Sequence, residues 1–144
     1  MPIEDLLIDK NKTLHTIGPD ETLKAAVTML ASNDVGALPV CDAGGKMVGI
    51  LSERDIVRTL NQPDADIGIM KISEIMKTNV ISAGPDDKIR DIIAIMKEKR
   101  IRHVPIIKDG ELVAMYSVRD LFTYLLEATQ AQRDTMTLAY EMVR

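Results

Sequence analysis

The feature that most constrains this chain is an internal duplication, because a repeated pattern requires a fold that contains the same unit twice. Three anchors recur in the same order in both halves: a Gly-Pro-Asp triplet, a lone proline and a Ser-x-Arg-Asp tetrapeptide. They are Gly18–Asp20, Pro39 and Ser52–Asp55 in the first half, and Gly84–Asp86, Pro105 and Ser117–Asp120 in the second. A unit of about 60 residues is marginally stable alone, so two units are expected to stabilise each other.

The same series of elements is predicted between the anchors of each half. Apolar residues at helical spacing follow each Gly-Pro-Asp triplet and predict an amphipathic helix, with Asp20, Glu21, Asp86 and Asp87 in the first turns. Two apolar runs separated by turn residues then predict a hairpin, and a second helix starts at each motif serine. The predicted strands are Thr13–Ile17, Val35–Cys41, Lys46–Leu51, Asn79–Ser82, Ile101–Ile107 and Glu111–Ser117.

These elements define the fold class as α/β (α+β), with two βαββα repeats packed as a pseudo-twofold pair and a C-terminal helical tail. Packing the two sheets face to face covers the apolar face that each repeat would otherwise leave bare. Residues 1–62 form the first repeat, 63–126 the second and 127–144 the helical extension, with a linker from Asn61 to about Ile69. The tail lacks glycine and proline from Leu121 onward, which predicts a long helix, broken near Thr129–Asp134.

Composition disfavours several classes of function. The net charge of −4 and the four aromatic residues disfavour nucleic acid as a partner, since such binders carry a basic surplus and rings for base stacking. One cysteine and two distant histidines predict neither a disulfide nor a metal site. The opening residues resemble neither a signal peptide nor a membrane span, so we expect a cytoplasmic protein.

The Ser-x-Arg-Asp motif has two interpretations. In the first, the serine caps a helix and the aspartate three residues later completes a capping box. In the second, the helix N-terminus and the arginine bind a phosphate, and the aspartate accepts hydrogen bonds from ribose hydroxyls. A single copy would favour capping alone. Two copies that both keep the arginine, Arg54 and Arg119, favour binding.

The segments that contain the two prolines differ between the halves. Proline occurs in sheets at edges and strand ends, so these segments are expected along sheet edges with backbone groups able to contact the edge of an adenine. Gly36 and Ala37 leave space in the first half, whereas Arg102 and His103 add charge in the second. Ordinary core strands with exposed ends remain the alternative.

The ordered set of features, present twice, resembles a pair of CBS domains in tandem. The resemblance rests on the strand–helix–strand–strand–helix order, the proline near the second strand and the closing Ser-x-x-Asp, and it extends from about Ile3 to Leu126. It implies a pseudo-symmetric pair with two clefts, each of which takes its ribose-binding aspartate from one repeat and much of its base-binding edge from the other.

The resemblance also implies which residues would bind an adenine nucleotide. The first cleft would use Ser117, Arg119, Asp120, Met115, Thr16, Val35, Gly36 and Ala37, and the second Ser52, Arg54, Asp55, Ile50, Ser82, Ile101, Arg102 and His103. Arg102 and His103 are expected near the twofold axis, within reach of phosphate in either cleft. Ala114 stands where the first repeat has Gly49, and Val118 where it has Glu53, so we expect clefts of unequal affinity. The Asp120 cleft is the favoured one, because Gly36 and Ala37 leave room for a base.

Charge narrows the ligands that the family resemblance implies. Arginines near both clefts suit phosphate oxygens and favour AMP, ADP, ATP or a NAD-type dinucleotide over S-adenosylmethionine. The resemblance implies a regulatory sensor without catalysis, which forms a homodimer and acts through a separate effector protein. A structural or assembly module with empty clefts, or a sensor of S-adenosylmethionine, is the alternative. An enzyme has the least support, because no nucleophile or acid–base set converges in the sequence.

Overall fold

The structure, a computed structural model, describes the backbone of residues 14–143 and, within this range, all side chains except those of 128, 131–140 and 143. Its elements repeat as the sequence predicts, apart from the first strand of each unit. In the first repeat they are α2 (Leu23–Asn33), β1 (Ala37–Cys41), β2 (Met47–Ser52) and α3 (Glu53–Leu60). The short helix η1 (Ile72–Glu74) follows, and the second repeat contains α4 (Ile89–Lys99), β3 (His103–Lys108), β4 (Glu111–Ser117) and α5 (Val118–Val143).

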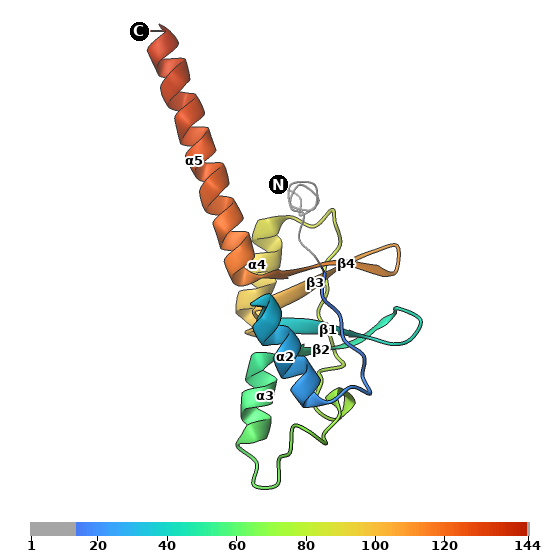
Figure 1. The fold of residues 1–144 in the computed structure, drawn as a ribbon. Coiled ribbons are helices and arrows are strands. Elements are labelled where there is room, and N and C mark those ends of the chain that lie inside the picture. Colours follow the sequence, from blue (N-terminus) through green and yellow to red (C-terminus); the bar gives the residue numbers. More distant parts are fainter. Residues whose placement is uncertain (1–13, 144) are drawn as a thin grey trace.

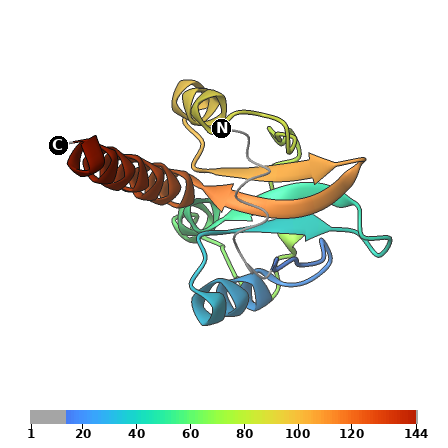
Figure 2. The same ribbon diagram turned by 90° about the horizontal axis from the view of Figure 1, so that it is seen from above.

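Two antiparallel hairpins form the centre of the molecule. Strand β1 pairs with β2, and β3 pairs with β4, each with a register shift near the middle of the hairpin. The hairpins lie one above the other, with α2 on the outer side of the first and α4 on the outer side of the second (Figures 1 and 2). The predicted α+β pair of repeats is therefore confirmed, and residues of both halves can meet between the hairpins.

Strands were predicted at Thr13–Ile17 and Asn79–Ser82. Thr13 lies outside the described residues, and over the rest of both ranges the prediction is wrong. Each strand is replaced by a single parallel bridge, Ile17 to Val40 in the first repeat and Ala83 to Ile106 in the second. The amide of Ile17 donates to the Pro39 carbonyl, and that of Ala83 to the Pro105 carbonyl. The chain turns away after this bridge at each Gly-Pro-Asp triplet, so no ladder develops.

The acidic residues at and just after the triplets were predicted in the first turns of the helices. They lie before the helices begin. Helix α2 begins only at Leu23, after an N-cap at Thr22, and α4 begins at Ile89. Glu21 accepts a hydrogen bond from the amide of Gly18 at 2.6 Å, and Asp87 accepts one from the amide of Gly84 at 2.7 Å. In each repeat the proline ends the extended segment. The carboxylate then closes the turn that leads into the helix.

The C-terminal helix is a single element. The predicted break near Thr129–Asp134 is absent, and α5 runs without interruption from Val118 to Val143. It starts at the second hairpin and projects away from the body of the molecule (Figure 1). With neither glycine nor proline in this stretch, nothing in the sequence interrupts the helical hydrogen bonds.

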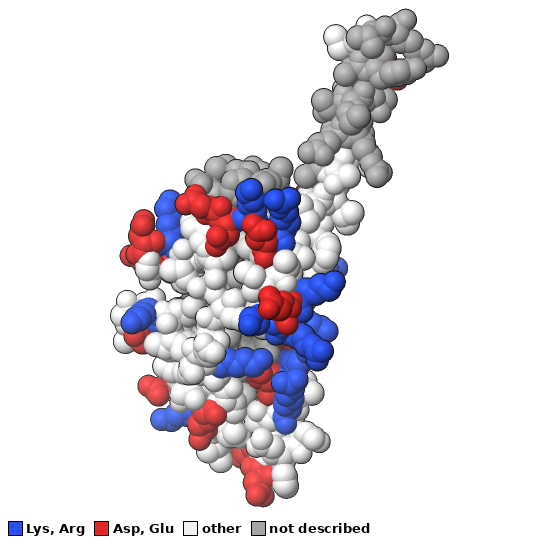
Figure 3. Space-filling model, turned by 180° about the vertical axis from the view of Figure 1, so that it is seen from behind, with Lys and Arg blue, Asp and Glu red and all other residues white. Residues whose placement is uncertain are grey.

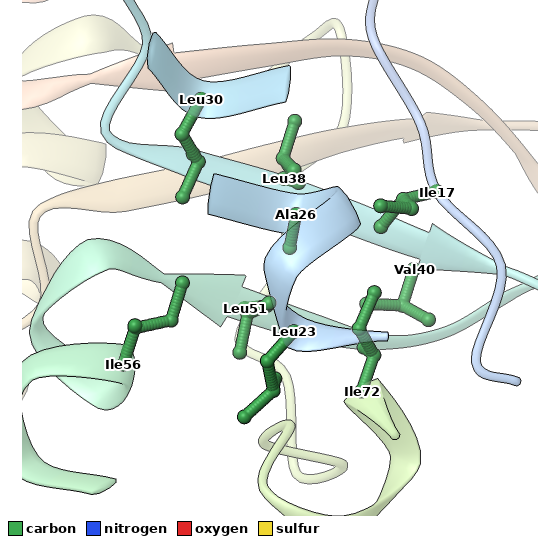
Figure 4. Close-up of a cluster of buried hydrophobic side chains, with 9 residues drawn as sticks. All are labelled: Ile17, Leu23, Ala26, Leu30, Leu38, Val40, Leu51, Ile56 and Ile72. Atoms are coloured by element: carbon green, nitrogen blue, oxygen red, sulfur yellow. The ribbon is translucent and has the colours of Figure 1, made fainter. Parts of the chain in front are cut away.

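Each repeat has its own apolar core. In the second repeat, Ile92 and Met96 of α4 pack with Val104 and Ile106 of β3 and with Leu121 of α5. The first core joins α2, both strands of the hairpin, α3 and η1 (Figure 4). Its buried side chains are Ile17, Leu23, Ala26, Leu30, Leu38, Val40, Leu51, Ile56 and Ile72.

The segment that connects the repeats belongs structurally to the first one. The predicted linker ends at Ile69, but residues 67–77 continue along the first repeat and pair with it at several places. Met70 accepts from the amide of Leu23, Thr22 bridges to Lys71, and Ile50 bridges to Lys77. We call residues 67–77 the connecting segment. Ile72 within it has no exposed surface and lies in the first core, although its sequence opens the second repeat.

Replacing Ile72 by alanine should therefore destabilise the first repeat. We expect the Ile72→Ala variant to lose about 2–5 kcal/mol in free energy of unfolding, since a fully buried isoleucine leaves a cavity. The matched control is Ile69→Ala, on the same segment but 76% exposed, which should change stability by less than about 0.5 kcal/mol. Equal effects of the two variants in urea denaturation would contradict this packing.

Candidate functional site

Both second helices begin with the capping box that the sequence predicts. At α3, the amide of Asp55 donates to the Ser52 hydroxyl oxygen at 3.2 Å, while the Asp55 carboxylate accepts from the Ser52 amide at 3.1 Å. At α5, Asp120 and Ser117 make the same two bonds, at 3.0 and 2.9 Å. The capping interpretation of both motifs is thus confirmed. The question that remains is what else these residues can bind.

A second hydrogen bond joins the start of each helix to the segment that enters the same hairpin. The amide of Glu53 donates to the Gly36 carbonyl at 3.0 Å, and at the equivalent place the amide of Val118 donates to the Arg102 carbonyl at 2.9 Å. The motif and the segment before the hairpin are therefore held side by side in each repeat. These are the two parts of the sequence for which a role in ligand binding is predicted.

A large cleft contains the second copy of the motif and residues of both repeats. We call it the Asp120 cleft; its volume is about 1480 Å³, more than the roughly 300–1,000 Å³ of a usual small-molecule site. Strand β4, the start of α5 and the end of α4 line it from the second repeat, and the segment before β1 lines it from the first. The predicted residues in it are Val35, Gly36, Ala37, Met115, Ser117, Arg119 and Asp120.

A smaller cleft contains the first copy of the motif. We call it the Asp55 cleft; its volume is about 390 Å³. The end of β2 and the start of α3 line it from the first repeat, and the segment before β3 lines it from the second. The predicted residues in it are Ile50, Ser52, Arg54, Asp55, Ile101, Arg102 and His103.

Two predicted residues lie outside the clefts. Thr16 and Ser82 are both exposed and line neither one. Leu14 and His15, just before Thr16, line the Asp120 cleft instead. The reason is the missing first strand: a single bridge at Ile17 or Ala83 leaves the preceding residues unpaired, so the alternation that would aim Thr16 and Ser82 inward does not develop.

The two clefts share one wall. Its members line both cavities and come from the segments before the hairpins and from the start of α3; they are Gly36, Ala37, Glu53, Arg54, Arg100, Ile101, Arg102 and His103. We call this set the shared wall. Arg102 and His103 were predicted to lie within reach of both clefts, and both belong to the shared wall.

The space beside Gly36 is smaller than the sequence suggested. A Cβ atom at this position would lie 3.2 Å from His103 Nε2 and 3.4 Å from Glu53 Oε1. The histidine of the second repeat thus occupies the room that the absent side chain leaves. Gly36 therefore allows the repeats to approach closely, and only part of the expected space is open to a base.

Several lining residues were missed by sequence reasoning. Arg100 lines both clefts, Lys97 and Tyr116 line the Asp120 cleft, and Lys77 lines the Asp55 cleft. Arg100 could have been found, because it is the basic counterpart of Asp34 in the repeat, and both residues end a first helix in the left-handed conformation, at φ 55° and 51°. Lys77 carried no signal, since the path of the connecting segment is not visible in the sequence.

The clefts are basic although the chain is acidic. The Asp55 cleft is lined by four lysines and arginines against two carboxylates, and the Asp120 cleft by five against three, leaving the histidines aside. Lys and Arg side chains also gather on the body near the point where α5 leaves it (Figure 3). An anionic ligand would be attracted to these clefts.

The buried Tyr116 phenol lies beside Asp120. Burial, and then the negative charge of that carboxylate, raise the pKa of Tyr116 above its usual value.

Comparison with known proteins decides the family. The model of the CBS domain matches residues 3–62 and 72–127. The chain belongs to the CBS-domain family. Its two domains follow each other in tandem, and residues 63–71, which were predicted to open the second repeat, lie between the two matches.

Similar proteins agree with this assignment. The CBS domain-containing protein YhcV of Bacillus subtilis is 31% identical over 106 residues, which cover 74% of each protein. Among solved structures, the CBS-domain containing protein ATU1752 from Agrobacterium tumefaciens is 31% identical, with a TM-score of 0.80 over 86% of this chain and 98% of that one. The CBS domain pair of protein MJ0100, solved in complex with 5′-methylthioadenosine and S-adenosylmethionine, is 27% identical, with a TM-score of 0.77 over 90% and 98%.

Two further findings concern residues 14–143. Within this part of the chain, no helix combines the length and apolar character needed to cross a bilayer. Among the side chains that the structure describes in this range, no group of three or more His, Cys, Asp or Glu is placed to hold a metal ion.

The contribution of the caps to the free energy of unfolding can be measured without a ligand. Ser52→Ala removes the hydroxyl that accepts from the Asp55 amide, so the free energy of unfolding should fall by about 1 kcal/mol. Ser73→Ala is the control: this serine is exposed and lies outside both caps. Ser117→Ala should behave like Ser52→Ala, and no loss in either variant would contradict a structural role of the caps.

Proposed function

We propose that this CBS-domain pair is a non-catalytic sensor that binds an adenine nucleotide, AMP, ADP, ATP or a NAD-type dinucleotide, in the clefts between its repeats. The observation that carries the proposal is the excess of basic side chains in both clefts of a chain with net charge −4. Clefts lined by an excess of one sign of charge raise the local concentration of oppositely charged ligands, here of an anion.

The other lining groups suit the rest of a nucleotide. Asp120 and Asp55 offer carboxylate oxygens to ribose hydroxyls, next to a helix N-terminus and an arginine that suit phosphate. Met115 and Ile50 pair with the strand prolines and provide apolar surface for a base. The Asp120 cleft is proposed as the main site, because it has the larger volume.

The charges also favour a nucleotide over S-adenosylmethionine, one of the two ligands in the MJ0100 structure. S-Adenosylmethionine carries a sulfonium and an ammonium group against one carboxylate, so it would place positive charge beside the arginines of the shared wall. A phosphate would instead accept hydrogen bonds from their guanidinium groups. Binding would shift the relative pose of the two repeats if the ligand has different affinities for two such poses.

We further propose that the protein forms a homodimer and passes its signal to a separate effector protein. Helix α5 exposes Phe122 and Leu126, one turn apart, by 50% and 71%, while α3 exposes Val57 and Leu60. Val57 and Phe122 are equivalent positions of the two repeats. Exposed apolar residues at matching positions suit a symmetric contact with a second copy.

An assembly module with empty clefts is the second candidate for the function, since the motifs also serve as caps.

Replacing the proposed ribose ligand should weaken binding. In Asp120→Asn, the affinity for the tightest nucleotide of a panel of AMP, ADP, ATP and NAD should fall about ten-fold or more, because a charge-assisted hydrogen bond is lost. Isothermal titration calorimetry would measure this. Asp109→Asn, in the exposed β3–β4 turn, is the control and should leave affinity unchanged. If Asp120→Asn loses stability but keeps its affinity, the aspartate is only a cap.

The proposed dimer can be tested on the full chain. Leu126→Glu places a charge on the exposed apolar face of α5, so light scattering should show a dimer for the wild type and a monomer for the variant. Thr123→Glu, on the same helix and also exposed, is the matched control and should remain dimeric. A wild-type monomer at concentrations of about 100 µM, where micromolar contacts are formed, would contradict the proposal.

A further inference from the structure

The connecting segment brings one cation to the Asp55 cleft from outside both hairpins. Lys77, its last residue, lines this cleft and lies next to β2. Its amide donates to the Ile50 carbonyl, and its carbonyl accepts from the Ile50 amide, both at 2.9 Å. The two backbone bonds fix the position of Lys77, while its side chain remains 55% exposed and free to reorient.

A glycine makes this close approach possible. A Cβ atom on Gly49 would lie 2.9 Å from the Lys77 carbonyl oxygen and 2.7 Å from the Met76 sulfur. No side chain fits there, so the connecting segment can rest directly on β2. The equivalent position of the second repeat is Ala114, which makes this contact a property of the Asp55 cleft.

Lys77 holds the carboxylate for which a ribose role is proposed. Its Nζ atom lies 3.6 Å from Asp55 Oδ1, and this carboxylate is only 9% exposed. The other oxygen, Oδ2, accepts from the Ser52 amide at 3.1 Å and from the Ser52 hydroxyl at 2.9 Å. Both oxygens of Asp55 are therefore engaged. A ribose hydroxyl that donates to Oδ1 would compete there with the lysine ammonium.

We propose that Lys77 is a ligand-selecting residue of the Asp55 cleft, which exchanges its ion pair with Asp55 for a phosphate group of the bound nucleotide. This inference rests on the proposed nucleotide-binding function and specifies how one cleft chooses its ligand. A nucleotide with a phosphate gives the displaced ammonium a new anionic partner beside Arg54 and Arg102 of the shared wall. A nucleoside without phosphate displaces the lysine and gives it no partner, so its binding is penalised.

An ion pair that only supports the fold would behave differently. A lysine that is half exposed contributes little to stability through such a pair. A structural role would therefore change binding of all ligands alike, or of none. Selection by Lys77 predicts opposite responses of a phosphorylated and an unphosphorylated ligand.

The experiment measures AMP and adenosine binding by calorimetry to the full chain in an Asp120→Asn background, so that the Asp55 cleft dominates. Lys77→Met should weaken AMP binding about ten-fold, since one charge-assisted hydrogen bond is lost. It should leave adenosine binding unchanged or strengthen it, because Asp55 no longer has a competitor for Oδ1. Lys71→Met, on the same segment but outside both clefts, is the matched control and should change neither affinity.

The outcomes separate this inference from the proposed function. If Lys77→Met leaves AMP affinity intact, or weakens AMP and adenosine equally, Lys77 does not select the ligand, while the nucleotide-binding function stands. If the unsubstituted chain binds none of AMP, ADP, ATP and NAD, the proposed function fails and this inference fails with it. A loss for AMP alone supports the exchange of partners.

Discussion

The geometry of both clefts depends on where the second helix of each repeat begins. Two interactions fix this point: the reciprocal bonds between the motif serine and aspartate, and the bond from the first helical amide to the segment before the hairpin. Since the same pair recurs in both repeats, the starts of α3 and α5 and the two segments are placed around one pseudo-twofold axis. Residues 54 and 102, remote in sequence, thereby reach a common wall.

The pseudo-symmetry is incomplete, and its departures give the two clefts different properties. Gly36 and Arg102 occupy equivalent positions in the wall of both cavities, yet the glycine makes room for His103, whereas the arginine adds a positive charge. Gly49 admits the connecting segment and with it Lys77, while Ala114 stands at the matching place. One cleft is large; the other is smaller, and its aspartate forms an ion pair with Lys77.

The duplication allowed much of this to be predicted from the sequence. Hairpin bounds were correct within two residues, because apolar runs around turn residues are local signals. Twelve of the sixteen predicted site residues needed only the two motifs and the segments before the hairpins, and fourteen of the sixteen line a cleft, with Thr16 and Ser82 as the exceptions. What could not be predicted depends on tertiary contacts. The reduction of the first strands to single bridges and the path of residues 67–77, which brings Lys77 to Asp55, leave no periodic pattern.

The basic clefts of this acidic chain are proposed to select phosphate-bearing adenine ligands. The most direct test is calorimetric titration of the wild-type chain with AMP, ATP, NAD, adenosine and S-adenosylmethionine at two salt concentrations. We expect at least one phosphate-bearing ligand to bind more tightly than adenosine and S-adenosylmethionine, and its affinity to fall as salt screens the arginines. Tight binding of S-adenosylmethionine alone, or of no ligand in the series, would contradict the account.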